Sequence, residues 1–366
     1  YSLLWPVEND ELSPGIRYKL TILAFFSITG ILVFSISVYS VLEIKQGYDI
    51  DVEDVAILIA VYGTYYMVSA YLNNQHQIAL LERDLSQFYK FGKPPGFEQL
   101  NSQLNFAVKV LIIYSFLGTF VYNGTKMLLR EECKKNSQEK GLSDNHCGLI
   151  ATFMFPFRVD YFPVFYIVLV ITFLLAHTLI KLCMHISFNA YEIVNHIVLR
   201  IEHLKEMILS CFNERNQTIV QKKLRVCILY HIEILDMAAR LDKNFFNTMF
   251  GHFALTGAIC ACLEKQIVLG VNIVAGTLHF IGWIIALFVG CVAGQCLLNA
   301  SEIIPNALWA AKWYHADLRT QKTLLFMLAR SQKELTIKAG PFGILCFPLF
   351  VTVLKTSYSI LCMLTS

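Results

Sequence analysis

Seven stretches of the chain are apolar for long enough to form membrane-spanning helices. A helix that crosses the hydrocarbon core of a bilayer needs about 20 largely apolar residues. The stretches that meet this condition are residues 20–42, 55–72, 106–127, 161–184, 250–274, 278–298 and 342–364. Glu264 and Lys265 interrupt the fifth stretch, and only a short gap around Gly276 separates it from the sixth, which predicts a hairpin. The pattern predicts an all-α polytopic membrane protein with seven transmembrane helices.

The polar connections also carry helical patterns. Apolar residues recur every three or four positions after the fourth stretch and before the fifth, which indicates amphipathic helices. The first series is Ile193, Ile197, Ile201, Leu204 and Ile208, and the second is Leu224, Ile228, Ile232, Leu235 and Ala239. A shorter series, Leu324, Leu325 and Leu328, precedes the seventh stretch. Two interpretations stay open: these faces cover one another, or they pack between subunits.

A break is expected before the last apolar stretch. Gly340 and Pro341 are adjacent there, and proline removes a backbone donor while glycine loosens the turn. We therefore expect a polar helix that ends near Lys338 and a spanning helix that starts at Phe342. Residues 1–366 are interpreted as a single membrane domain, which consists of a bundle at 20–298, anchor helices at about 186–246 and 302–339, and a last helix at 342–364.

The distribution of Lys and Arg predicts the orientation of the chain, because cytoplasmic connections are enriched in these residues. The connections after the second, fourth and sixth stretches hold three, eight and six of them, whereas the connection after the first holds one. We therefore expect a cytoplasmic N-terminus, cytoplasmic anchor helices and an extracellular C-terminus. The connection at 128–160 is an exception with five basic residues, and we still place it outside because the other connections agree.

The same connection at 128–160 holds Cys133 and Cys147, which predict a disulfide if this side is extracellular. Most of the other cysteines lie in apolar stretches, where they are interpreted as small apolar side chains. Asn123 begins a glycosylation sequon at the edge of the third stretch. The chain begins with Tyr1 rather than Met, so we expect its true start to be missing, and its polar first segment does not resemble a cleavable leader.

The composition agrees with a chain that faces lipid. Of the 366 residues, 56% are hydrophobic and 16% are charged, against about 45–50% and about 25% in soluble domains. The sequence has no phosphate-binding Gly-Lys-Ser/Thr loop, no Gly-x-Ser-x-Gly elbow and no His-Glu-x-x-His motif. His196 and His203 on a predicted helix are interpreted as packing histidines. We therefore expect no enzyme, no cofactor and no metal site.

The last apolar stretch carries polar residues at helical spacing, namely Thr352, Lys355, Thr356 and Ser359. Polar groups that face lipid are costly, so this stripe is expected to face protein or water. A neighbouring stripe of small and apolar side chains consists of Ser357, Leu361 and Leu364. A water-lined helix with a ring of apolar side chains suits a pore with a hydrophobic gate. Ordinary packing against another helix explains the same pattern, so both interpretations stay open.

Short motifs follow one another over about the last 65 residues: Ser301-Glu302, Trp309 and Trp313, Ala329 to Lys333, Ala339-Gly340, and Leu354 to Ser359. Their order resembles the C-terminal pattern of insect odorant receptors. The segment from Phe153 to Phe157, with Pro156, is similar to the proline-aromatic segment that precedes the fourth spanning helix of that family. Trp309 is a departure, because the family often has Tyr there.

The resemblance implies a ligand-gated cation channel in the plasma membrane of a sensory neuron dendrite. In that family a tuning subunit binds the odorant and assembles with the odorant receptor co-receptor (Orco), here expected in a tetramer. The last helix of the family lines the pore, and its gate position corresponds to Leu361, with Ser357 and Leu364 beside it. The segment from Tyr358 to Leu361 differs from the ending of the co-receptor, so the chain is interpreted as a tuning subunit.

The ligand site of the family lies in the outer half of the bundle, among the second, third, fourth and sixth spanning helices. Aromatic side chains in a nearly charge-free cavity suit a small volatile molecule held by dispersion and one or two hydrogen bonds. The corresponding candidates are Leu58, Tyr62, Phe116, Phe120, Phe165, Tyr166, Leu169, Phe280, Trp283 and Ile284. Each of them also suits an ordinary place in the core.

Three other functions stay open. A channel of the gustatory receptor type shares the architecture and differs mainly in the last-helix motif. A metabotropic seven-helix receptor would have its N-terminus outside, and its Asp-Arg-Tyr and Asn-Pro-x-x-Tyr motifs are missing here. A transporter often has two matching halves and helices broken near the middle of the bilayer, whereas the clear break here is predicted at the membrane edge.

Overall fold

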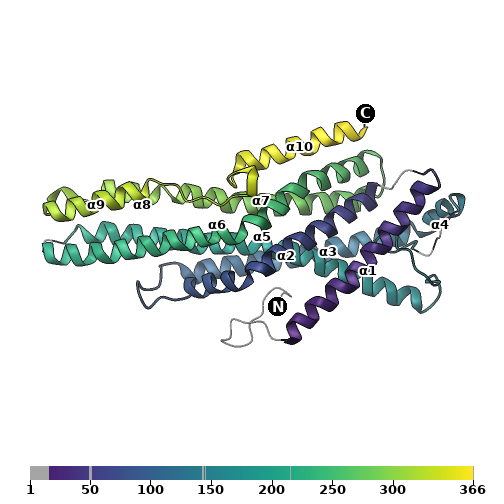
Figure 1. The fold of residues 1–366 in the computed structure, drawn as a ribbon, viewed down its shortest axis with the longest axis horizontal. Coiled ribbons are helices and arrows are strands. Elements are labelled where there is room, and N and C mark those ends of the chain that lie inside the picture. Colours follow the sequence, from purple (N-terminus) through teal and green to yellow (C-terminus); the bar gives the residue numbers. More distant parts are fainter. Residues whose placement is uncertain (1–15, 49–51, 142–143, 145, 215, 366) are drawn as a thin grey trace.

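The computed structural model describes residues 16–48, 52–141, 144, 146–214 and 216–365 (Figure 1). Its elements are α1 (Ile16–Lys45), α2 (Val52–Leu85), α3 (Phe97–Leu128), α4 (Arg130–Glu139), α5 (Val164–Cys211), α6 (Gln217–Val268), α7 (Ile273–Ala300), α8 (Ile303–Ala310), η1 (Trp313–His315), α9 (Leu318–Ser331), η2 (Gly340–Phe342) and α10 (Phe347–Thr365). Seven helices in the described ranges are long and apolar enough to cross a membrane, which confirms the predicted fold class. The interpretation of the N-terminal segment concerns residues 1–15, which lie outside these ranges.

The two longest helices, α5 and α6, run along most of an elongated molecule (Figure 1). The helix α2 packs along α6, and α5 packs against α3, α6 and α7. One end of the molecule carries α4 and the connection at 146–163, here called the loop end (Figure 1). At the opposite end α5 and α6 continue beside α8 and α9, and we call residues 193–211, 217–239 and 303–331 the helical extension.

The helical extension has one face that is covered within the chain and one that is not. The apolar series on α5, from Ile193 to Ile208, is buried as predicted. The series predicted on α6 is only partly correct, since Leu224 is buried but Ile232 is 56% exposed. The buried face of α6 includes Ile234 instead, so α6 carries a second, outward apolar face. One face of the extension is therefore covered within the chain, as the first interpretation expected, and the second apolar face of α6 is uncovered in the single chain.

A buried arginine fastens the extension to α2. Arg200 of α5 is 2% exposed, and its Nη2 donates to the carbonyl of Leu85 over 2.6 Å and to that of Gln87 over 3.3 Å. The last carbonyls of a helix have no partner inside the helix, and they carry the negative end of its dipole. Arg200 supplies both donors and positive charge at this position. Arg240 of α6 adds an ion pair to Asp84 over 2.8 Å.

The break before the last helix is confirmed, but its ends differ from the prediction. The polar helix α9 ends at Ser331 rather than near Lys338, and α10 begins at Phe347 rather than Phe342. A tight reversal fills the gap, in which the N–H of Leu345 donates to the carbonyl of Ile337 over 2.8 Å. Two residues of this reversal have a positive φ, 57° at Gly340 and 102° at Gly343, a backbone conformation that favours glycine. These two residues let the chain turn back on itself, so neither helix extends through the segment.

Candidate ligand cavity and last helix

An apolar cavity of about 200 Å³ lies among the spanning helices α1, α2, α3, α5 and α7. The connection at the loop end adds Ile150, Ala151 and Phe153 to its wall. Engineered apolar cavities of about 150 Å³ hold a benzene molecule, so this space admits a one-ring molecule. The cavity lies on the helices that the resemblance implied, with α1 and the connection as additional walls.

Small residues create this cavity. Ala60, Ala176 and Gly282 lie on its wall, and Gly118 of α3 has no atom within 4 Å of the place where a Cβ would stand. A larger side chain at any of these positions would extend into the space. The helices are packed around this space, but the small side chains on its wall do not fill it, and a cavity remains.

Among the expected ligand residues, only Trp283 lines the cavity. On α3 the wall consists of Tyr114, Ser115, Gly118, Thr119 and Tyr122, whereas Phe116 and Phe120 lie on the outward face, and Phe120 is 63% exposed. Tyr62 and Tyr166 also point outward and are exposed. These four aromatic side chains therefore lie outside the cavity wall, since large aromatic side chains on a membrane helix are as well placed against lipid as against protein.

The remaining expected ligand residues are packed away from the cavity. Phe165 is buried in a small cluster at the loop end that also contacts Leu58 and Leu169. Phe280 and Ile284 pack against the main core. They lie on the predicted helices, but their side chains point from a face next to the one that lines the cavity. A step of one residue along a helix rotates the direction of the side chain by about 100°, so a small error in position changes the face.

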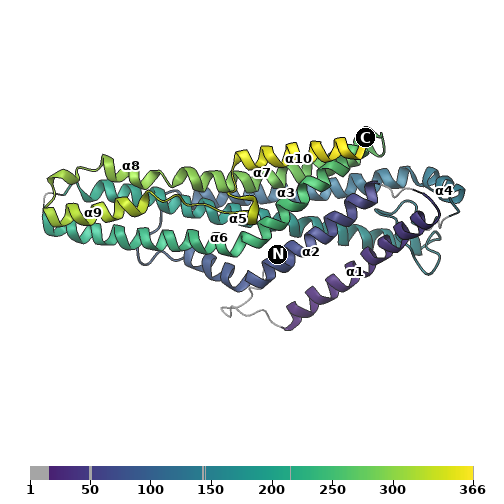
Figure 2. The same cartoon turned by 45° about the horizontal axis from the view of Figure 1, so that its top comes forward.

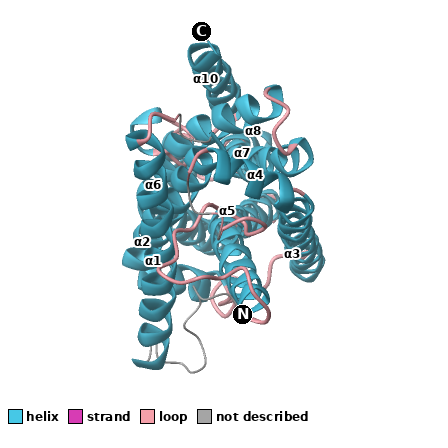
Figure 3. Cartoon of the chain, turned by 90° about the vertical axis from the view of Figure 1, so that its right-hand side faces the viewer, coloured by secondary structure: helices cyan, strands magenta, loops and turns pink. Residues whose placement is uncertain are grey.

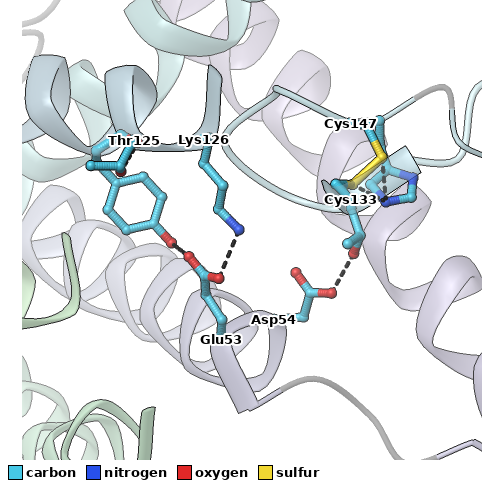
Figure 4. Close-up of polar contacts among 9 residues, drawn as sticks. Glu53, Asp54, Thr125, Lys126, Cys133 and Cys147 are labelled. Carbon is cyan, nitrogen blue, oxygen red and sulfur yellow. Dashed lines mark hydrogen bonds and ion pairs between the residues drawn. A yellow bond between two sulfur atoms is a disulfide. The ribbon is translucent and has the colours of Figure 1, made fainter. Parts of the chain in front are cut away.

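Two acidic residues at the start of α2 hold α3 and the connection at the loop end (Figure 4). Glu53 at the start of α2 accepts hydrogen bonds from Tyr122 and from Lys126, the latter over 2.7 Å. Asp54 accepts from Thr152 over 2.5 Å. These carboxyl groups are buried, so their charges are compensated by specific partners rather than by water. Glu53 pairs with residues about 70 positions away and Asp54 with a residue about 100 positions away, so no local sequence pattern indicates these contacts.

Two cysteines and a sequon also lie at the loop end. The structure joins Cys133 of α4 to Cys147 by a disulfide (Figure 4). Asn123, which begins the sequon, is inside α3 and buried, and its Nδ2 donates to the carbonyl of Thr119 over 2.9 Å. The amide nitrogen to which a sugar would be attached is thus engaged within its own helix.

The last helix, α10, lies at the edge of the bundle, where one of its sides packs against α6 and α7 (Figures 2 and 3). Its buried residues are Leu349 and Ser357. The polar stripe of Thr352, Lys355, Thr356 and Ser359 is exposed along its free side. A helix of a membrane protein that is polar on its free side is expected to face water or another protein chain.

The three expected gate residues lie in different environments. Leu364 is 41% exposed and Leu361 is half-buried. Ser357 is 0% exposed, and its Oγ donates to Oε1 of Glu264 on α6 over 3.1 Å. Glu264, which interrupts the fifth apolar stretch, thus provides Ser357 with a partner within the chain.

The walls of the cavity are connected to α10 through α6. The Trp283 ring stacks on His252 of α6 with 5.9 Å between ring centroids, and α6 also carries Glu264, the partner of Ser357. In addition, Nζ of Lys265 donates to the carbonyl of Leu364 over 2.9 Å. A movement of the Trp283 side chain would therefore change its packing against α6, the helix on which α10 is docked.

Comparison with known proteins places this architecture in a family. A family model described as 7tm Odorant receptor matches residues 51–358. Odorant receptor 22c of Drosophila melanogaster is 28% identical over 187 residues, which are 50% of this chain and 46% of that protein. Odorant receptor 82a of the same organism is 27% identical over 150 residues, which are 40% of this chain and 39% of that protein. The matched parts thus span less than half the length of these relatives.

The fold has counterparts among solved structures. The insect olfactory receptor OR5 from Machilis hrabei in complex with eugenol superposes with a TM-score of 0.74 at 12% identity, and the match covers 99% of this chain and 95% of that one. The structure of OR5 itself gives a TM-score of 0.71 at 11% identity, over 98% and 92% of the two chains. Since the family model covers most of the sequence and the fold agrees over nearly the whole chain, this protein belongs to the insect odorant receptor family.

Proposed function

We propose that the chain is the odorant-binding tuning subunit of a heteromeric ligand-gated cation channel in the plasma membrane. The observation that carries this proposal is the apolar cavity of about 200 Å³ that is lined by five spanning helices and the connection at the loop end. A space of this size and character suits a small volatile molecule rather than a peptide or an ion. OR5, which shares the fold, was solved with eugenol, a one-ring molecule of a similar kind.

The pore would be lined by α10. In the single chain the stripe from Thr352 to Ser359 is exposed, and lipid contact would leave its hydroxyl groups and Lys355 in hydrocarbon. If four subunits place their α10 helices around one axis, this stripe faces water or a neighbouring α10. Leu361 is the proposed gate, because a narrow apolar ring repels water and thereby blocks ions.

The partner subunit would be the odorant receptor co-receptor. The outward apolar face of the extension supports an interface there, since Leu229, Ile232 and Phe326 are exposed in the single chain. Exposed apolar patches of this kind mark sites of association. The proposed orientation puts the extension in the cytoplasm and the disulfide outside, where disulfides persist.

Ligand binding would open the pore through α6. An odorant can shift the equilibrium only if it binds the open state more tightly than the closed one. A ligand beside Trp283 changes the packing of its ring against His252, and α6 transmits that change to Ser357 through Glu264.

The test is whole-cell current from cells that express this chain together with the co-receptor. We expect one-ring volatile molecules to evoke an inward cation current that neither subunit gives alone. Surface expression without current for a broad panel of such molecules would contradict the channel function. A C-terminal epitope tag should be accessible to antibody on unpermeabilised cells, whereas an accessible N-terminal tag would instead favour a metabotropic receptor.

A further inference from the structure

Trp283 and His279 stand one helical turn apart on α7, and both line the cavity. The Nε1–H of Trp283 donates a hydrogen bond to Nε2 of His279 over 3.0 Å. An indole nitrogen is only a donor, so the Nε2 atom that accepts this bond holds a lone pair. A protonated imidazole has no such lone pair. His279 is therefore neutral in this arrangement, and its single ring proton lies on Nδ1.

The Nδ1–H of His279 has no hydrogen-bond acceptor among the residues that the structure describes. A donor that is left without an acceptor in an apolar space is costly. His279 is partly buried, and the surrounding wall is almost entirely hydrocarbon. The ring thus presents an unmatched donor beside the cavity.

The hydroxyl groups of the cavity wall differ from His279, because each of them already donates a hydrogen bond to an acceptor within the protein. Their acceptors are the carbonyls of nearby residues, or Glu53 in one case: Tyr114 to Leu278, Thr64 to Ala60, Thr119 to Ser115, Ser115 to Ile112, Thr172 to Val168, Thr29 to Phe25, and Tyr122 to Glu53. Each of these protons is occupied, so none competes with His279 for an acceptor on a ligand.

We propose that His279 is the hydrogen-bond donor to the ligand, and that the cavity selects one-ring molecules that carry an acceptor oxygen, such as a ketone, ester or ether. Trp283 is a positioning residue for this role, because its indole N–H holds the proton of His279 on Nδ1. The inference rests on the proposed function, since it concerns the same cavity.

A pair of isosteric probes tests the donor. Acetophenone and α-methylstyrene have nearly the same shape, but the carbonyl oxygen of the first is replaced by a methylene group in the second. Binding is measured by the thermal stabilisation of the purified full chain in detergent. We expect the wild type to bind acetophenone roughly 3- to 10-fold more tightly, which corresponds to one net hydrogen bond.

Two variants assign this preference to His279. His279→Leu removes the donor, so we expect both probes to bind equally, at the affinity that the wild type has for α-methylstyrene. His279→Asn keeps an N–H donor near the position of Nδ1, so we expect it to retain part of the preference. Binding of α-methylstyrene to each variant shows that its cavity is intact.

The outcomes separate this inference from the proposed function. Equal binding of the two probes to the wild type, or a preference that persists in His279→Leu, overturns the role of His279 while the cavity stands as a ligand site. If neither probe binds the wild type, the cavity fails as a site for one-ring molecules, and the proposed function and the inference both fall. If His279→Leu does not fold, the wild type and His279→Asn still decide the question.

Discussion

Ser357 of α10 donates a hydrogen bond to Glu264 of α6 over 3.1 Å, and it is the most buried residue of the last helix. The opposite side of α10 is uncovered in the single chain. The Ser357 hydroxyl group therefore connects α10, which has few buried residues, to α6. Its partner Glu264 is a carboxyl group within an otherwise apolar segment of α6. This contact should control how firmly α10 is docked.

We expect Ser357→Ala to loosen α10, because the substitution removes a buried hydrogen bond worth about 1 kcal/mol. Amide hydrogen exchange in α10 should become faster. Ser359→Ala is the matched control, since the Ser359 hydroxyl is exposed and donates to the Lys355 carbonyl within the same helix. Equal exchange in the two variants would argue against a docking role for the contact with Glu264.

Leu361→Ala should raise the current that flows without odorant, because a smaller side chain widens and wets an apolar constriction. Whole-cell recording with the co-receptor measures this leak. Leu354→Ala, two turns earlier and equally half-buried, controls for lost packing on the same helix. A leak of similar size in both variants would mean that packing, rather than a gate, is responsible.

Gly118→Leu should weaken the response to odorants, because the new side chain extends into the cavity without meeting another atom at its Cβ. We expect the half-maximal odorant concentration to rise roughly tenfold or more. Gly124→Leu is the matched control, since Gly124 lies on the same helix with equally open space but outside the cavity wall. An unchanged response of Gly118→Leu would rule out this cavity as the ligand site.

The ion pair of Glu53 and Lys126 should be much more important to stability than an exposed pair. The Glu53 side chain is 4% exposed, so Lys126→Met removes the positive charge paired with a buried carboxylate, at a cost of about 3 kcal/mol. The double variant with Glu53→Gln should recover part of the melting temperature. Lys93→Met, which breaks the exposed pair with Glu98, should cost about 1 kcal/mol or less. Similar melting shifts for Lys126→Met and Lys93→Met would contradict this.

Arg200→Leu should destabilise the junction of the extension with α2, because the carbonyl of Leu85 loses its buried donor. The expected cost is about 3 kcal/mol, seen as a lower melting temperature. Arg225→Leu provides the comparison, since Arg225 lies on the exposed surface of α6. Arg200→Lys should be intermediate, because a lysine keeps the charge but not the planar set of donors. No difference between the two leucine variants would show that the junction does not depend on Arg200.

Some features of this protein were accessible from its sequence because they depend on local properties. A stretch of about 20 apolar residues is sufficient to predict a spanning helix, so the number and order of these helices were predicted correctly. Gly340 and Pro341 marked the break because their backbone restrictions act in any context. The buried series from Ile193 to Ile208 was visible because its other faces are polar.

The faces of the spanning helices were decided only by the tertiary structure. In water, the alternation of polar and apolar residues distinguishes the outside of a helix from its inside, whereas lipid is as apolar as a protein core. The sequence therefore could not tell outward Phe120 from a cavity residue, and it concealed the role of Gly118. The partners of Glu53 and Ser357 were equally hidden, because each lies on another helix that only packing brings near.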